Sequence, residues 1–162
     1  MYKVAIITAS DKGYAGERED KSGSVIEEIV TAHELEVTGK VILPDDRQML
    51  SDQMLNYCHQ GIDLILTTGG TGFSKRDVTP EATADIVERR ADNLTFAMIA
   101  NSLQYTPKAM LSRGIAGIRE NTLIVNLPGS PKAVRENLEY AIDAIIHGVE
   151  ILKGDDAECA RK

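Results

Sequence analysis

The chain has 162 residues, of which 43% are hydrophobic and 4% aromatic, and its formal net charge is −7 at pH 7. This length accommodates one α/β domain with a buried core and is too short for two domains of ordinary size. The acidic balance argues against a general nucleic-acid or anionic-membrane binder, because such proteins need an electropositive face to displace counterions.

The N-terminal segment and the cysteines predict a cytoplasmic protein. Residues 1–10 contain an apolar run that is too short for a signal peptide, and no run approaches the roughly 20 apolar residues of a membrane span. Cys58 and Cys159 are far apart and lack metal-ligand spacing beyond the Cys58-His59 pair, so we expect reduced thiols.

Three β-branched runs in the first half of the chain predict buried parallel strands, at residues 3–8, 36–43 and 63–68. Apolar residues recur at helical spacing between these runs, over residues 25–33 and 50–58. The resulting β-α-β-α-β order predicts an α/β fold, namely a three-layer, doubly wound and mostly parallel sheet with helices on both faces.

The second half of the chain carries three [Ser/Thr]-Pro helix starts. Thr79 reads as the N-cap and Pro80 as the first residue of a helix over residues 79–90, and the same signal recurs at residues 106–107 and 130–131. The last helix has the clearest pattern, because one apolar face continues along residues 134–152.

Two short strands are predicted between these helices, at residues 114–119 and 122–127, with a turn at Glu120-Asn121. No internal repeat interrupts the pattern. We therefore expect residues 1–154 to form a single domain and residues 155–162 to form a polar C-terminal tail that frays.

Polar residues follow four of the predicted strands. Ser10-Asp11 follows the first, Asp45-Asp46 the second, residues 68–77 the third and residues 126–130 the last. Ligands of open α/β sheets bind beyond the carboxyl ends of the strands, so these groups should meet at one rim. The charged segment 12–23 follows the first strand and is either a loop that folds over this site or a plain solvated loop.

The glycine-rich stretch TTGGTGFSKRDVTPEAT, residues 67–83, matches neither familiar phosphate motif. A Walker loop needs a Gly-Lys-[Ser/Thr] ending, and the dinucleotide fingerprint needs a glycine where Lys75 stands. The glycines can still turn backbone N–H groups inward to form a nest for an anion or a flat ring. A tight turn after the strand is the alternative interpretation.

Acidic residues flank the glycines. Asp45 and Asp77 would form a pair suited to one hydrated Mg²⁺, which takes only one or two carboxylates and keeps water and phosphate oxygens. Turn or capping roles are the alternative for each acid.

Two further features concern anions. The N-terminus of the last helix favours an anion, with Ser130 as its cap. The adjacent cations Lys75 and Arg76 either bind phosphate or face solvent. The residues alone thus predict a domain that binds a phosphorylated ligand with Mg²⁺, for phosphoryl or nucleotidyl transfer.

These segments together resemble the MogA/MoaB family of molybdenum cofactor biosynthesis, which includes the G domain of gephyrin. The resemblance rests on LTTGGTGFSKRDVTPEAT and LSRGIAGIRENTLIVNLPGSPKA, with ITASD, DKSG and PDD earlier in the chain. It implies a molybdopterin-binding fold, commonly a homotrimer, and Mg²⁺-dependent adenylation of molybdopterin by ATP with release of pyrophosphate. The product would pass to molybdate insertion, which makes a molybdate insertase the implied partner.

The resemblance also implies roles for individual residues. Asp45 and Asp77 would be the catalytic carboxylates and the Mg²⁺ ligands, with less weight on Asp46. The residues that would bind the nucleotide or the pterin are Ser10, Asp11, Gly69, Gly70, Thr71, Gly72, Ser112, Pro128, Gly129 and Ser130. The chain departs from the bacterial pattern PGxxExxR over residues 92–99, a departure that affects pterin-side contacts and the trimer surface.

Two other functions are compatible with the sequence. One is a non-catalytic MoaB-type protein that binds molybdopterin or a nucleotide, because some relatives share the motifs without clear adenylation activity. The other is a flavodoxin-like nucleotide binder unrelated to molybdenum, which FMN should stabilise.

Overall fold

A six-stranded sheet with the order β2-β1-β3-β6-β5-β4 forms the centre of the molecule in the computed structural model, which describes residues 1–155. Its strands are β1 (Lys3–Ala9), β2 (Glu36–Leu43), β3 (Leu64–Thr68), β4 (Arg89–Arg90), β5 (Ala116–Arg119) and β6 (Thr122–Leu127). The first four in this spatial order are parallel, and β5 and β4 are antiparallel to their neighbours. The sheet is therefore mostly parallel, as predicted.

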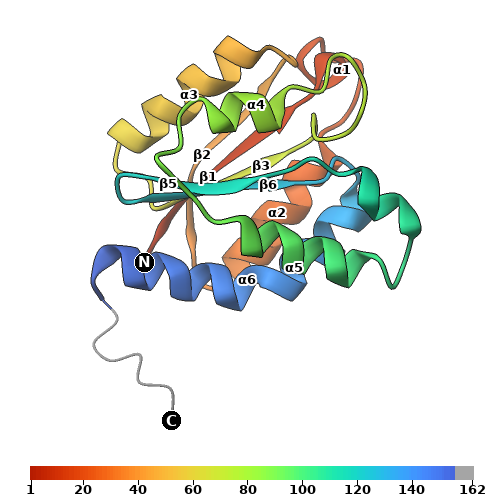
Figure 1. The fold of residues 1–162 in the computed structure, drawn as a ribbon. Helices are drawn as coiled ribbons and strands as arrows, with labels where there is room; N and C mark the ends of the chain where they lie inside the picture. Colours follow the sequence, from red (N-terminus) through yellow and green to blue (C-terminus); the bar gives the residue numbers. More distant parts are fainter. Residues whose placement is uncertain (156–162) are drawn as a thin grey trace.

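Helices cover both faces of the sheet (Figure 1). One layer contains α3 (Arg47–His59) and α4 (Thr79–Ala84), and the other contains α2 (Lys21–Ala32), α5 (Asp92–Ser102) and α6 (Pro131–Lys153). A single turn, α1 (Asp11–Tyr14), and a 3-10 helix, η1 (Pro107–Leu111), lie in the connections. The predicted three-layer, doubly wound architecture is confirmed.

The core has two parts because successive residues of a strand point to opposite faces of the sheet. On β1, Val4 and Ile6 pack into the layer of α2 and α6, whereas Ala5 and Ile7 pack into the layer of α3. The central strands β1, β3 and β6 are almost entirely buried, which explains why they read as continuous apolar runs.

Helix α6 has the boundaries that its sequence predicts. The Ser130 side chain accepts a hydrogen bond from the backbone N–H of Ala133, Pro131 begins the helix, and Gly154 ends it in the left-handed conformation. Its apolar face, which includes the fully buried Leu138, lies against the sheet.

Three expectations about the elements are wrong in detail. Strand β2 is not buried: it lies at the sheet edge, and its residues alternate between exposed and partly buried. Thr79 is the first helical residue rather than the N-cap, because its N–H already donates to Gly70 O, and Val78 precedes the helix without a side-chain cap. Segment 12–23 is not one loop, because it contains α1 and the start of α2.

The helix predicted over residues 79–90 stops after Ala84. Sheet pairing ends it, because Arg89 and Arg90 form β4 beside β5 and Glu88 N–H donates to Ile118 O. Gly117 permits this approach, since a Cβ there would lie 2.8 Å from Val87 Cβ. Tertiary pairing therefore overrides the local helical pattern.

None of the helices within residues 1–155 is long and apolar enough to cross a membrane. Cys58 is buried and forms no disulfide bond within residues 1–155. Cys159 and the remainder of the predicted tail, residues 156–162, lie outside the described residues.

A buried asparagine joins several elements. Asn126 of β6 donates from Nδ2 to the hydroxyls of Thr67 and Thr83, at 2.9 and 3.0 Å, and accepts from the N–H of Ile115 at 3.0 Å. It thus links β3, α4 and the start of β5 to the central strand. Such a buried network is stabilising only while every member is paired.

Replacing Asn126 by Ala should lower the free energy of unfolding by about 2–4 kcal/mol, because the buried N–H of Ile115 would lose its partner. Urea denaturation of Asn126→Ala measures this loss. Asn56→Ala is the matched control, because Asn56 is exposed on α3 and its variant should unfold at the wild-type urea concentration. Equal midpoints for the two variants would contradict the role of the network.

Candidate functional site

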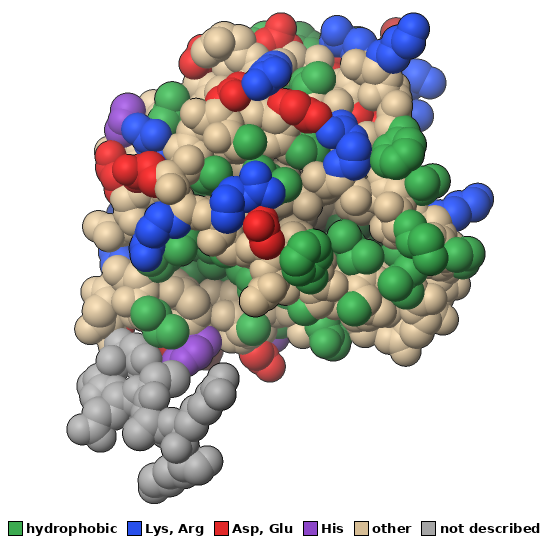
Figure 2. All heavy atoms as spheres, in the orientation of Figure 1, with side chains coloured by type: hydrophobic (Ala, Val, Ile, Leu, Met, Phe, Trp, Pro, Cys, Tyr) green, Lys and Arg blue, Asp and Glu red, His purple; other side chains and the backbone are tan. Residues whose placement is uncertain are grey.

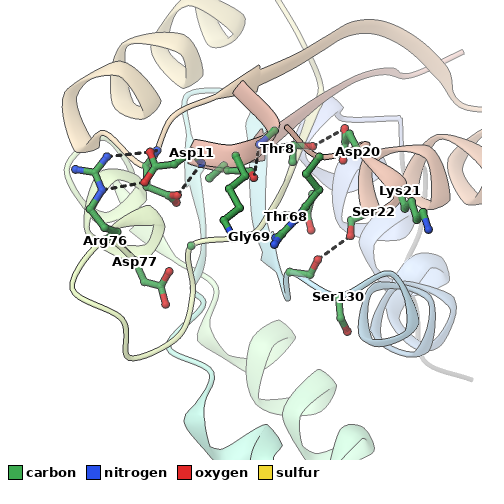
Figure 3. Close-up of a pocket in the computed structure, with 18 of the residues that line it drawn as sticks. Thr8, Asp11, Asp20, Lys21, Ser22, Thr68, Gly69, Arg76, Asp77 and Ser130 are labelled. Atoms are coloured by element: carbon green, nitrogen blue, oxygen red, sulfur yellow. Dashed lines mark hydrogen bonds and ion pairs between the residues drawn. The ribbon is translucent and has the colours of Figure 1, made fainter. Parts of the chain in front are cut away.

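A cleft of about 970 Å³ opens beyond the carboxyl ends of β1, β3 and β6 (Figure 3). Its walls come from the loops after these strands, the loop after β2 and the starts of α2 and α6. The residues predicted from sequence that line it are Ser10, Asp11, Asp45, Asp77, Gly69, Gly70, Gly129 and Ser130. Residues from four distant parts of the sequence thus meet at one rim, as the parallel topology requires.

Four of the predicted site residues do not line the cleft. Thr71 is buried and Gly72 is partly buried, and neither lines the cleft. Ser112 and Pro128 line a separate cavity of about 210 Å³ between α5, η1 and α6. Thr95, Met98 and Ile99 also line that cavity, so the segment where the chain departs from the bacterial pattern forms part of its wall.

The loops after β1 and β2 are joined by a reciprocal pair of hydrogen bonds. The Asp11 N–H donates to Asp45 Oδ2 at 3.1 Å, and the Asp45 N–H donates to Asp11 Oδ1 at 3.0 Å. Arg76 adds two bonds from Nε and Nη2 to the Asp11 carboxylate, at 3.0 and 2.9 Å. These guanidinium bonds, with the Asp45 N–H, hold the pKa of Asp11 below its ordinary value.

The second oxygen of Asp45 is in an unfavourable position. Oδ1 is buried and has no hydrogen-bond partner among the described residues. Burial, together with the nearby charges of Asp11 and Asp77, raises the pKa of Asp45, although the N–H of Asp11 opposes the change. A cation or a hydrogen-bond donor from a ligand would satisfy this oxygen.

The glycine loop packs directly against these polar groups. Gly70 has φ +67°, and a Cβ there would come within 2.4 Å of Thr79 Oγ1 and 3.0 Å of Asp45 Oδ1. A Cβ on Gly72 would come within 2.9 Å of Asp77 Oδ2. Only glycine leaves room for the carboxylates at these two positions.

Asp77 closes a turn and also lines the cleft. Its N–H donates to Ser74 O at 3.0 Å, and its Oδ2 accepts from the Ser74 N–H at 3.1 Å. Figure 3 shows its side chain on the wall formed by the glycine loop, near Arg76. The turn role predicted as an alternative is therefore present together with a place in the cleft.

The opposite wall is formed by the N-termini of α2 and α6. Ser22 Oγ donates to Gly129 O at 2.7 Å and fastens these helix starts together (Figure 3). Asp20 caps α2 through the Gly23 N–H and accepts from the Thr8 hydroxyl, both at 2.9 Å. The dipoles of the two helices favour a negatively charged ligand on this wall.

Sequence reasoning did not select several residues of this wall. The cleft residues that were missed are Thr8, Lys12, Gly13, Arg18, Glu19, Asp20, Lys21, Ser22 and Thr68. Two signals were available, because segment 12–23 is rich in charge and DKSG belongs to the resemblance. Residues from both ends of this segment line the cleft, although the segment is not the single loop that either alternative assumed.

The adjacent cations Lys75 and Arg76 differ in position. Arg76 lines the cleft and is ion-paired with Asp11, whereas Lys75 is exposed and does not contribute to the cleft wall. Within residues 1–155, no three His, Cys, Asp or Glu side chains are grouped so that they could hold a metal ion. The protein alone thus offers at most the pair of carboxylates for a cation.

The chain matches a known family model, described as "Probable molybdopterin binding domain", over residues 5–147. The chain belongs to this family. This result contradicts the alternative of a flavodoxin-like protein unrelated to molybdenum. It confirms the predicted family.

Named relatives extend the match to nearly the whole chain. The protein is 38% identical over 155 residues to the molybdopterin adenylyltransferase of Helicobacter pylori, which covers 94% of this chain and 88% of that protein. It is 41% identical over 159 residues to gephyrin of Dictyostelium discoideum, across 92% of this chain. The chain spans only 22% of the length of that gephyrin.

A solved structure has the same fold. The molybdopterin biosynthesis enzyme MoaB of Thermus thermophilus superposes with a TM-score of 0.90 at 42% sequence identity, covering 95% of this chain and 98% of that chain. The similarity is therefore global and includes every element that lines the cleft.

Asp45→Asn should stabilise the folded protein at neutral pH, because it removes a partly buried negative charge that lies near Asp11 and Asp77. We expect the melting temperature to rise by about 2–4 °C, which in a chain of this size corresponds to about 1 kcal/mol. Thermal unfolding at pH 7 measures the change.

The pH dependence and a control variant show whether the change in melting temperature comes from the charge of Asp45 or from any Asp→Asn replacement nearby. Because the folded-state pKa of Asp45 is raised, its stability contribution is present at low pH and is lost as the pH rises through that pKa. The difference between Asp45→Asn and wild type should thus shrink as the pH falls. Asp46→Asn, at the exposed N-cap of α3, should leave the melting temperature unchanged, since Asn caps equally well. A less stable Asp45→Asn variant would contradict the prediction.

Proposed function

We propose that this protein is a molybdopterin adenylyltransferase of molybdenum cofactor biosynthesis. The observation that carries the proposal is the cleft, which is lined by Asp45 and Asp77 together with residues at the N-termini of α2 and α6. The 38% identity to the enzyme of that name in Helicobacter pylori supports the choice of reaction.

The proposed reaction joins two anions. An oxygen of the terminal phosphate of molybdopterin attacks the α-phosphorus of ATP and forms a new P–O bond. The bond from the α-phosphorus to the oxygen that bridges to the β-phosphate breaks, and pyrophosphate leaves with that electron pair. Such a displacement needs positioning of both phosphates and stabilisation of charge in the transition state.

The chain supplies these requirements from two sides of the cleft. Lys21, Ser22 and Ser130 line the cleft at the N-termini of α2 and α6, which are suited to hold the phosphates. Gly69 and Gly70 bring backbone close to that space, because Gly70 carries no side chain between the loop and Asp45. These groups bind and orient the two anions for in-line attack.

The residues present fit Mg²⁺ bound together with substrate phosphates. Asp45 Oδ1 is an unsatisfied buried oxygen, and the nearby charge of Asp77 contributes to the raised pKa of Asp45. Mg²⁺ takes one or two carboxylates and fills its other positions with water and phosphate oxygens, which agrees with a site of two acids. When bound by Asp45 and Asp77, it would neutralise phosphate charge during the transfer.

The proposal extends to assembly, location and partners. Figure 2 shows hydrophobic side chains gathered over α5 and η1, where Phe96, Met110 and Leu111 are each at least half exposed. Contiguous apolar surface of this kind supports an interface with other copies, as in the homotrimer that the family resemblance implies. We place the protein in the cytoplasm, with a molybdate insertase as the recipient of adenylated molybdopterin.

The second candidate is a non-catalytic protein that binds molybdopterin or a nucleotide. Its inclusion rests on the family resemblance, because some MoaB-type relatives share the motifs without clear adenylation activity. Purified protein incubated with molybdopterin, Mg²⁺ and ATP decides between the two, because only the enzyme releases pyrophosphate and forms adenylated pterin. Binding of molybdopterin without pyrophosphate release would replace the proposed function by the second candidate.

Asp77→Asn and Asp45→Asn should each reduce kcat by about 100-fold or more, because each removes a charge that the cation and the phosphates require. Folding should persist, since both residues lie in loops outside the core. Pyrophosphate release under saturating ATP measures kcat. The control Asp46→Asn changes an acid next to Asp45 that does not line the cleft, and it should retain wild-type turnover. Full activity of either cleft variant would remove that residue from the catalytic assignment.

A further inference from the structure

The loop that carries Asp77 has internal hydrogen bonds in a turn over residues 74–77, and the rest of it depends on contacts from outside. Between Gly69 and Val78 it contains no helix or strand, and residues 73–76 are exposed, with Phe73 70% exposed. Apolar packing therefore does not hold this loop in place. A carboxylate on such a loop keeps one position only if polar contacts from outside restrain the backbone.

Arg113 supplies these contacts from the segment that precedes β5. Its Nε donates to Gly72 O at 2.7 Å, and its Nη2 donates to Asp77 O at 2.9 Å. Its backbone N–H donates to Thr71 O at 2.8 Å. One residue thus binds carbonyl oxygens near the beginning and at the end of the loop.

The third guanidinium nitrogen is anchored to α4. Arg113 Nη1 forms an ion pair with Glu81, which lies in the first turn of α4 directly after the loop. Burial raises the pKa of Glu81, but the hydrogen bond and charge of Arg113 more than offset that effect, and the net pKa is lowered. The Glu81 carboxylate and the Arg113 guanidinium are therefore both charged at neutral pH.

The geometry suits arginine and no other residue type. Three nitrogens of one planar group reach three acceptors in different directions, and a lysine ammonium cannot span both carbonyl oxygens while it pairs with Glu81. The Arg113 side chain is 34% exposed and does not line the cleft. Any influence on chemistry must consequently pass through the loop.

We propose that Arg113 is a positioning residue that clamps the glycine loop and thereby places the Asp77 carboxylate in the cleft. This inference rests on the proposed function for its catalytic consequence, but the clamp itself is a property of the free protein. Removal of the side chain would release Gly72 O and Asp77 O and allow the loop to sample other conformations. Asp77 would then face the phosphates for only part of the time.

The test compares Arg113→Ala and Arg113→Lys with Arg135→Ala. Arg135 is the matched control, because it is 39% exposed, pairs with Glu28 and Glu139, and does not line the cleft. Three measurements are made on each full-length protein: the melting temperature, amide hydrogen exchange of residues 72–78 without substrates, and kcat and KM for ATP.

We expect exchange in residues 72–78 to become at least tenfold faster in Arg113→Ala, with other segments unchanged. The kcat should fall by about 30-fold or more with a smaller change in KM, because the lost positioning acts mainly in the transition state. Arg113→Lys should resemble the alanine variant in exchange and kcat while it keeps more stability through Glu81. Added guanidinium at millimolar concentration should restore part of the kcat of Arg113→Ala, and methylammonium should not.

Several results would overturn the inference. Wild-type exchange of the loop in Arg113→Ala would show that the clamp is unnecessary, and faster exchange with unchanged kcat would show that loop order does not affect Asp77. Wild-type exchange and kcat in Arg113→Lys would show that charge alone suffices. If wild type forms no adenylated molybdopterin, the proposed function fails, and the hydrogen-exchange arm still decides whether Arg113 holds the loop.

Discussion

The carboxylate of Asp45 is partly buried, and burial disfavours its charged form. The loops around the cleft keep it in that position. The carboxylate accepts a hydrogen bond from the N–H of Asp11, while its other oxygen, beside Gly70, is buried and has no partner within residues 1–155. The nearby charges of Asp11 and Asp77 are also negative, and the positive charge of Arg76 offsets them only in part, so the pKa of Asp45 is raised. A folded chain keeps such an arrangement only where surrounding contacts determine it, and functional sites are the usual place for it.

The contacts that impose this arrangement come from the parallel sheet. Strands β1, β3 and β6 end at the same edge, so the loops that follow them are forced together. Thr68 Oγ1 donates to Pro128 O at 2.6 Å, and the space beside Gly129 is filled by the backbone of Gly69. The loops therefore support one another, and the acids cannot move apart without loss of these bonds.

The two walls of the cleft differ in what they present to a ligand. Asp11 and Asp77 lie on the side of α1 and the glycine loop, and the N-termini of α2 and α6 form the other side, with Asp20 at the cap of α2. Helix N-termini attract phosphate oxygens, so the second side supplies a local positive potential for an anionic ligand. This division explains how an acidic protein can bind anionic substrates: the favourable potential is local, and the net charge of −7 describes the whole surface.

Much of the fold and half of the site follow from local sequence signals. The β-branched runs of β1 and β3, the Ser130-Pro131 start of α6 and the turn at Glu120 are determined by residues a few positions apart. The rule that ligands lie at the carboxyl ends of parallel strands then brings Asp11, Asp45 and Asp77 to one rim. Where a local signal competed with long-range pairing, as at Arg89 in β4, prediction failed.

The sequence by itself determined the class of fold, the order of its elements and the family, because periodicity, capping residues and motifs are properties of neighbouring positions. Only the tertiary structure decided how the site is held. Arg113 reaches Gly72 and Asp77 across separations of 41 and 36 residues, and the buried Oδ1 of Asp45 lies against Gly70 of a loop that follows another strand. Such contacts depend on the path of the whole chain, which no local pattern encodes.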